Sequence, residues 1–186
     1  MILNSNSSIK KKSILVIDDD PGCYLTVNLM LEKYYNIISA DSGKTGIDIA
    51  LTNLPDLILL DIAMPEMDGF ETAKVLKENN ETKGIPIIIL TGRDNKDDLA
   101  LAFDYGAVEY IIKPFSFEDI YPRVKTHIEL SSYKNNLEVM LAIKTKELKD
   151  MNDSLISKNI ALKEVLNSIV NCNGILIQSC NRKLIQ

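Results

Sequence analysis

The chain has 186 residues, of which 46% are hydrophobic and 25% are charged. This composition is typical of a globular protein and leaves room for one full domain and a smaller unit. Its three cysteines form no Cys-x-x-Cys pair, which argues against a disulfide framework or a zinc site and predicts a reducing, cytoplasmic compartment. No apolar run approaches the roughly 18 residues of a membrane span, so no membrane partner is expected.

The net charge of −5 is distributed unevenly along the chain. Residues 1–120 carry 11 Lys/Arg against 20 Asp/Glu, or −9, whereas residues 121–186 carry 10 against 6, or +4. A chain with this balance is a poor general nucleic-acid binder, so no direct contact with nucleic acid is expected. Residues 1–12 are polar and then basic, and we interpret them as a flexible leader and not as a signal peptide.

In chain order, the first element is an apolar run at Ile14–Ile17 that ends in three carboxylates, Asp18, Asp19 and Asp20. Pro21 follows, and proline is well suited to the first turn of a helix. The pattern predicts a strand, an acidic turn and a helix.

The central stretch of the sequence is a second apolar run, Leu57–Leu60, which ends abruptly in Asp61. A short apolar run bounded by turn residues is typical of a strand buried on both faces, as in a parallel sheet. Ligands of open α/β sheets bind at the carboxyl ends of the strands. Asp is also common in turns, so this stretch alone leaves open whether Asp61 is functional or a loop cap.

The rest of residues 13–120 alternates between strand and helix patterns. Strands are expected at 36–40, 87–90 and 108–112, and helices at 42–54, 70–79 and 97–105, with Gly106 closing the last of these. Ser116 is expected to cap the helix that follows. Five strands alternating with five helices predict a parallel sheet with helices on both faces.

Polar groups follow four of these strands and should therefore converge at one edge of the sheet. They are Asp18 with Asp19, then Asp61, Thr91 and Lys113. Clustered carboxylates repel one another unless a cation joins them, and a hard divalent ion such as Mg²⁺ suits oxygen ligands. A cation there would let a carboxylate attack an incoming phosphoryl group, whose oxygens Lys113 and Thr91 would contact.

These residues resemble the signatures of response regulator receiver domains. The resemblance rests on the acidic pair Asp18-Asp19, on Leu59-Leu60-Asp61-x-x-Met64-Pro65-x-Met67-Asp68-Gly69, on Leu90-Thr91-Gly92 and on Lys113-Pro114-Phe115, and it covers about residues 13–130. It implies a flavodoxin-like, doubly wound, five-stranded parallel sheet of order 2-1-3-4-5 with an extended C-terminal helix. It also implies that Asp61 accepts a phosphoryl group from a histidine kinase or a histidine phosphotransfer protein in a phosphorelay.

The same resemblance assigns roles around Asp61. Asp19, Asp61 and the Ala63 carbonyl would bind Mg²⁺, with Asp18 helping through water. Thr91 and Tyr110 would be the switch hydroxyl and the aromatic residue that reorients with it, and the Lys113-Pro114 peptide would be cis. Gly92 departs from the alanine that is more usual, which leaves room above the site and could alter the lifetime of the phosphoryl group.

Four other polar residues are expected to be structural. We interpret Asp20 as a helix N-terminal charge, Glu66 and Asp68 as loop and capping residues, and His127 as a structural helix residue.

From residue 121 onward the pattern becomes helical. Apolar residues step by four and three and form a heptad seam broken by two lysines: Leu137, Leu141, Lys144, Leu148, Met151, Leu155, Lys158, Leu162, Val165 and Ile169. We expect a coiled-coil signalling helix at 131–170 that forms a homodimer; the alternative is a helix that packs on its own domain. Residues 171–186 suggest the start of an incomplete β-containing unit or a loose tail. The segment from Leu166 to Ile185 is faintly similar to the opening of a PAS domain.

Two other functions compete with the phosphoacceptor switch. A haloacid-dehalogenase-type phosphatase would need a second Asp two residues after the nucleophile, where this chain has Ala63. A pseudo-receiver would use the fold only as a dimerisation scaffold. We therefore expect a signalling domain and not an enzyme.

Overall fold

The computed structural model describes residues 11–92 and 101–183, and for residues 170–183 it describes only the backbone. The chain forms two compact units, residues 1–134 and 135–186. Within the described residues, no helix is both long and apolar enough to cross a membrane.

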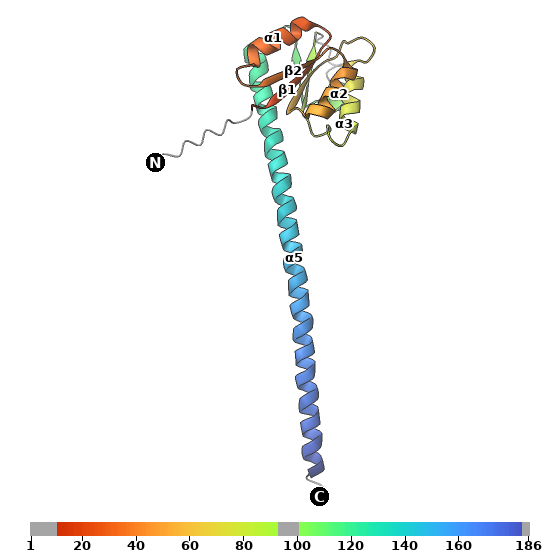
Figure 1. Cartoon of the computed structure of the whole chain (residues 1–186), viewed down its shortest axis with the longest axis vertical. Coiled ribbons are helices and arrows are strands. Elements are labelled where there is room, and N and C mark those ends of the chain that lie inside the picture. Colours follow the sequence, from red (N-terminus) through yellow and green to blue (C-terminus); the bar gives the residue numbers. More distant parts are fainter. Residues whose placement is uncertain (1–10, 93–100, 184–186) are drawn as a thin grey trace, which may run out of the picture. The chain divides into compact units, whose positions relative to one another are not determined.

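Five parallel strands form one sheet in the order β2-β1-β3-β4-β5, as predicted (Figure 1). The strands are β1 Ser13–Ile17, β2 Asn36–Ala40, β3 Leu57–Asp61, β4 Ile87–Thr91 and β5 Glu109–Ile112. The helices are α1 Pro21–Leu31, α2 Gly43–Asn53, α3 Gly69–Glu78 and α5 Phe117–Lys183. The helix predicted at 97–105 lies partly outside the described residues, and residues 101–104 are helical.

Helices cover both faces of the sheet, which explains why the central strands are continuously apolar. Every residue of β3 and β4 is buried. Because side chains alternate along a strand, Leu60 faces one core cluster with α2 and α3, whereas Leu59 faces another with α1 and the start of α5 (Figure 1). The edge strands β2 and β5 are only partly buried.

Side chains at the first turns explain where the helices begin. Asp20 caps α1 by accepting a hydrogen bond from the Gly22 N–H, and Pro21 occupies the first turn, as the sequence predicted. Ser42 caps α2. Asp68 caps α3 by accepting a hydrogen bond from the Glu71 N–H. The Glu71 side chain accepts a hydrogen bond from the Asp68 N–H, which completes a capping box.

The helix predicted for residues 131–170 is confirmed as part of α5, but the strand pattern suggested after residue 170 is wrong. The structure gives Ile175–Ile177 as helix. A short apolar run fits a helix as well as a strand, and one glycine such as Gly174 costs a helix only about 1 kcal/mol. The division of the chain at residues 130 and 170 stays a prediction.

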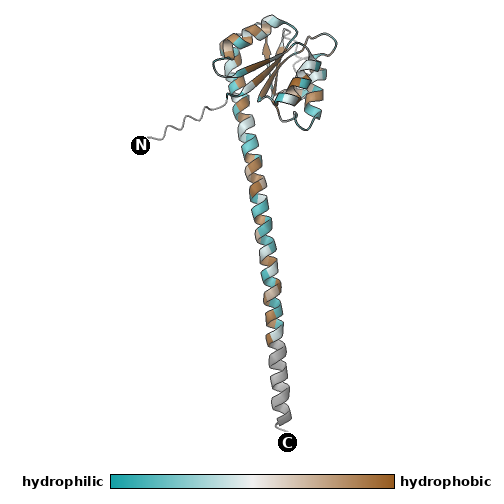
Figure 2. Ribbon diagram, viewed as in Figure 1, coloured by the Kyte–Doolittle hydropathy of each residue, from teal (hydrophilic) through white to brown (hydrophobic). Residues whose placement is uncertain are grey.

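Apolar side chains of the second unit are exposed. The seam residues Leu141, Leu148, Leu155 and Leu162 are 55–65% exposed. Other exposed apolar residues lie off the seam: Val139, Met140, Ile143, Ile156, Ile160 and Leu166. In Figure 2, hydrophobic and hydrophilic segments alternate along α5.

Candidate phosphoacceptor site

The carboxyl ends of four parallel strands bring the predicted site residues to one edge of the sheet. Asp18 follows β1, Asp61 ends β3, Thr91 ends β4 and Lys113 follows β5. Asp18, Asp61 and Thr91 are buried, in contrast to most charged and polar residues at strand ends. The neighbouring strands β1, β3, β4 and β5 thus end at the same edge of the sheet, and the roles expected of these side chains stay predictions.

Lys113 joins the two buried carboxylates. Its Nζ lies 2.6 Å from Asp18 Oδ2 and 2.6 Å from Asp61 Oδ1. Backbone N–H groups hold the other carboxylate oxygens, since Asp20 N donates to Asp18 Oδ1 at 2.9 Å and Ala63 N donates to Asp61 Oδ2 at 2.8 Å. Both carboxylates are thus fixed in orientation. The Lys113-Pro114 peptide is cis, as the resemblance implied.

The pKa values show that a single ammonium group does not fully compensate this site. Burial raises the pKa of Asp61, and the charge of Asp18 adds to the effect, although the hydrogen bond from Lys113 opposes it. Burial alone would lower the pKa of Lys113, but its hydrogen bonds to Asp18 and Asp61 outweigh burial and raise the pKa above the usual value. Lys113 therefore stays charged, and the site retains an excess of negative charge.

Asp18, Asp19 and Asp61 form a set of oxygen donors that fits a divalent cation. One carboxylate oxygen from each lies within 4.8 Å of the others. Asp19 is exposed, whereas the other two are buried, so an ion here could keep water on its open side. Three carboxylates share one ammonium group, and added positive charge would relieve their repulsion.

Thr91 and Tyr110 lie on the neighbouring strands β4 and β5. Thr91 is buried beside the end of β3. Tyr110 pairs in register with Ile89, is partly buried, and its ring centroid lies 6.2 Å from that of Phe103 in an edge-on arrangement.

The residues expected to be structural lie outside this cluster. Asp20 and Asp68 are helix caps. Glu66 adopts a left-handed backbone conformation with φ of 64° in the loop before α3. His127 Nε2 lies 3.8 Å from Glu109 Oε2, on β5.

Sequence reasoning missed two neighbours of the site. Cys23, from α1, is buried next to Asp18; burial, then the hydrogen bond with Asp18, raises the pKa of its thiol to about 12. Phe70, from α3, lines a cavity of about 510 Å³ with Asp61, Thr91 and Gly92. Neither residue was singled out by the sequence, and only the fold shows that they adjoin the carboxylates.

Comparisons with known proteins agree with this geometry. The response regulator receiver domain family matches residues 14–125. A probable cyclic di-GMP phosphodiesterase of Vibrio cholerae is 36% identical over 167 residues, which cover 86% of this chain and 38% of that protein. The response regulator ArlR of Staphylococcus saprophyticus is 34% identical over 127 residues, which cover 68% of this chain and 56% of that protein. This chain thus spans about two fifths to just over half of the length of these two relatives.

Solved structures share the fold. The crystal structure of a putative response regulator from Chloroflexus aurantiacus superimposes with a TM-score of 0.62 and 30% identity, over 64% of this chain and 99% of that one. The chain belongs to the response regulator receiver domain family and serves as a phosphoacceptor domain of two-component signalling.

Proposed function

We propose that Asp61 is the residue that accepts the phosphoryl group from a histidine kinase or a histidine phosphotransfer protein. The observation that carries this proposal is the position of Asp61 at the end of the central strand, buried, with Lys113 Nζ 2.6 Å from Oδ1. A carboxylate oxygen of Asp19 lies within 4.8 Å of one of Asp61, so both could hold one cation. A histidine kinase of Formosa agariphila, 36% identical over 120 residues, is among the relatives.

The neighbours of Asp61 supply the chemistry of transfer. The Ala63 N–H donates a hydrogen bond to Asp61 Oδ2, which fixes the orientation of the carboxylate before transfer. A carboxylate oxygen attacks the phosphorus, and the bond to the donor breaks. Lys113 is kept charged by its two carboxylates, so its ammonium group can contact the phosphoryl oxygens and stabilise the negative charge that develops on them.

Mg²⁺ fits the donor set of Asp18, Asp19 and Asp61. The Ala63 carbonyl would be a further ligand. When bound, such an ion neutralises the charge of the phosphoryl group. Asp19, the exposed member, would be the ligand that meets the ion from solvent.

Thr91 and Tyr110 carry the signal away from Asp61 in this proposal. The Thr91 hydroxyl would bond to a phosphoryl oxygen, and Tyr110 on the next strand would reorient with it. Gly92 is exposed, and a Cβ there would meet no atom within 4 Å, which leaves space for the transferred group.

Intact-mass analysis after incubation with acetyl phosphate and Mg²⁺ tests this proposal. We expect one added phosphoryl group on the wild-type chain and none on Asp61→Asn. Asp56→Asn is the matched control because Asp56 lies at the opposite end of β3, where it bonds Lys12 and Ser13. Addition to Asp61→Asn at the wild-type rate would contradict the assignment, and no addition to any protein would favour the pseudo-receiver scaffold.

We further propose that α5 pairs with its copy in a homodimer. The support is the exposed heptad seam of the second unit, whose apolar residues a lone chain would leave in water. Lys144 and Lys158 in the seam would weaken the pair and leave its strength open to control by the phosphoryl group. The expected cytoplasmic location and the expected lack of nucleic-acid binding stay predictions.

The relative from Vibrio cholerae suggests what α5 leads to. Its match covers 86% of this chain and so extends past residues 14–125 into α5. We infer that α5 transmits the switch to an output domain, of which a cyclic di-GMP phosphodiesterase is one candidate. Hydrolysis of cyclic di-GMP by the full-length protein, measured with and without acetyl phosphate, tests this: we expect the rate to change, and an unchanged rate contradicts it.

A further inference from the structure

Another cavity lies at the edge of the sheet opposite to Asp61. Lys12 and Tyr35, which line it, directly precede β1 and β2, so the cavity lies at the amino edge of these strands. Its other wall is one face of α5, from Tyr121 to Tyr133. The volume of about 450 Å³ is within the range of small-molecule pockets. Transfer of a phosphoryl group to Asp61 does not use this cavity.

Aromatic rings form much of the wall, since Tyr34, Tyr35, Tyr121 and Tyr133 all line the cavity. The ring centroids of Tyr34 and Tyr121 lie 4.8 Å apart, and Phe117 stacks on Tyr121 with centroids 4.9 Å apart. These contacts hold one side of the cavity in place. Tyr133, in contrast, is 73% exposed, so its ring is available to cover a flat ligand.

Charged groups of both signs stand beside the rings. Lys125 and Glu129, one helical turn apart on α5, line the cavity. Within the part of the chain that the structure describes, no hydrogen bond or ion pair uses either charged group. Burial, then Tyr121 and the charge of Glu129, raises the pKa of the Tyr35 phenol to about 12. The Tyr35 hydroxyl therefore stays protonated and is a hydrogen-bond donor at neutral pH.

We propose that this cavity binds a guanine nucleotide, with the base against the tyrosine rings, Glu129 on the base edge, and the phosphate on Lys125 and Lys12. Bases stack on aromatic side chains, whatever their sequence. The guanine edge carries two adjacent donors, N1–H and the 2-amino group, which match the two oxygens of a carboxylate. Adenine has an unprotonated N1 there, whose lone pair a carboxylate repels. Glu129 thus selects guanine, and the lysines bind the phosphate.

The position of the cavity indicates what binding would do. Tyr34 and Tyr35 belong to the turn between α1 and β2, whereas Ser132 and Tyr133 belong to α5. A nucleotide that contacts both segments would stabilise their packing and raise the melting temperature of the chain. Binding needs no phosphoryl group on Asp61, so this inference goes beyond the proposed function and does not depend on it.

Isothermal titration calorimetry of the whole chain without Mg²⁺, with GMP, cyclic di-GMP and AMP as probes, tests the proposal. We expect a dissociation constant below about 1 mM for at least one guanine probe, and at least roughly fivefold weaker binding of AMP. Glu129→Gln should weaken guanine binding about tenfold and remove the preference over AMP, because the amide replaces one acceptor by a donor. Tyr133→Leu should weaken guanine binding about fivefold through loss of stacking.

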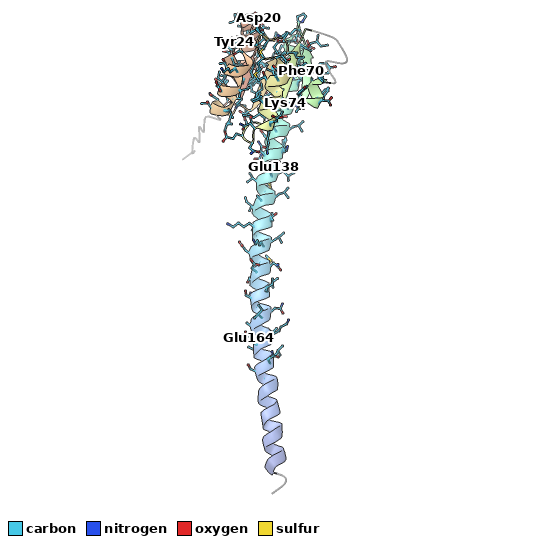
Figure 3. The ribbon with its side chains drawn as sticks, turned by 90° about the vertical axis from the view of Figure 1, so that its right-hand side faces the viewer. Asp20, Tyr24, Phe70, Lys74, Glu138 and Glu164 are labelled. Atoms are coloured by element: carbon cyan, nitrogen blue, oxygen red, sulfur yellow. The ribbon has the colours of Figure 1, made fainter. Side chains whose placement is uncertain are left out.

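Tyr24→Leu and Lys74→Ala are the matched controls, because Tyr24 on α1 and Lys74 on α3 lie outside this cavity (Figure 3). Both should bind as the wild type does. The proposal is wrong if neither guanine probe binds below about 1 mM, if AMP binds as tightly, or if Glu129→Gln keeps the preference. Tighter binding of cyclic di-GMP than of GMP assigns the cavity to cyclic dinucleotides, and the reverse order assigns it to mononucleotides.

Discussion

The charge of Asp61 sets the chemistry of the site and also weakens the fold. Burial raises the pKa of Asp61, so the folded state disfavours the ionised form. A carboxyl whose folded pKa exceeds its unfolded pKa stabilises the fold at low pH, and this contribution is lost as pH rises through the folded pKa. Without a divalent cation, Asp61→Asn should therefore be more stable than the wild type at pH 7.

Urea unfolding of both proteins without Mg²⁺, at neutral and at acidic pH, checks this prediction. The gain in free energy of unfolding should shrink as pH falls, because the protonated Asp61 carboxyl and the amide that replaces it in the variant are then both neutral. Equal stability at pH 7, or a gain that grows at acidic pH, contradicts the account.

Asp19 and Asp20 are adjacent carboxylates with different expected roles. Asp19 belongs to the carboxylate cluster with Asp18 and Asp61. The Asp20 side chain instead accepts a hydrogen bond from the Gly22 N–H at the start of α1. Asp19→Asn should weaken Mg²⁺ binding at least tenfold, since it removes a charged ligand, and Asp20→Asn should change it little because Asn caps a helix as well as Asp. Isothermal titration calorimetry with Mg²⁺ measures the affinity of both variants. Equal losses of affinity would mean that the residues of the acidic turn are assigned in the wrong register.

At the scale of elements, Gly69 sets how closely α3 approaches the end of β3. A Cβ at Gly69 would lie 2.2 Å from the Asp61 carbonyl oxygen and 2.8 Å from Ile62 Cα, and backbone atoms cannot move aside cheaply. Gly69→Ala should therefore lower the free energy of unfolding by about 1–3 kcal/mol. Gly84→Ala is the control, because a Cβ there meets nothing within 4 Å. Chemical denaturation of both proteins tests this, and equal effects contradict it.

The elements that the sequence predicted best are those with the strongest local signals. The apolar runs of β1, β3 and β4 indicated strands buried on both faces. Asp20 and Asp68 marked helix starts by their capping chemistry. The tail was harder, since Ile175–Ile177 fits both strand and helix periods.

Local sequence patterns also predicted only part of the site. Strand ends predicted Asp18, Asp61, Thr91 and Lys113, because parallel strands bring their carboxyl ends together. Phe70 and Cys23 could not be predicted as neighbours of the site. Their distance from Asp61 depends on how α3 and α1 pack on the sheet, which no local pattern specifies.

At the scale of the whole molecule, α5 offers adjacent residues for a test of pairing. Leu155 lies in the seam and is 55% exposed, and its neighbour Ile156 lies off the seam and is 51% exposed. Leu155→Lys should weaken the homodimer at least tenfold, because it buries a charge between helices, whereas Ile156→Lys should leave it intact. Sedimentation of the whole chain measures both. A wild-type chain that sediments as a monomer, or equal effects of the two changes, contradicts pairing through this seam.

One side chain, Asp61, is proposed to carry the phosphoryl group. The most direct measurement is to phosphorylate the wild-type chain with acetyl phosphate and Mg²⁺, reduce it with borohydride and sequence its peptides by mass spectrometry. Reduction converts an aspartyl phosphate to homoserine and so marks the acceptor permanently. We predict homoserine at residue 61 and Asp at residues 18 and 19. Homoserine at either of those positions instead of at 61 would contradict the account.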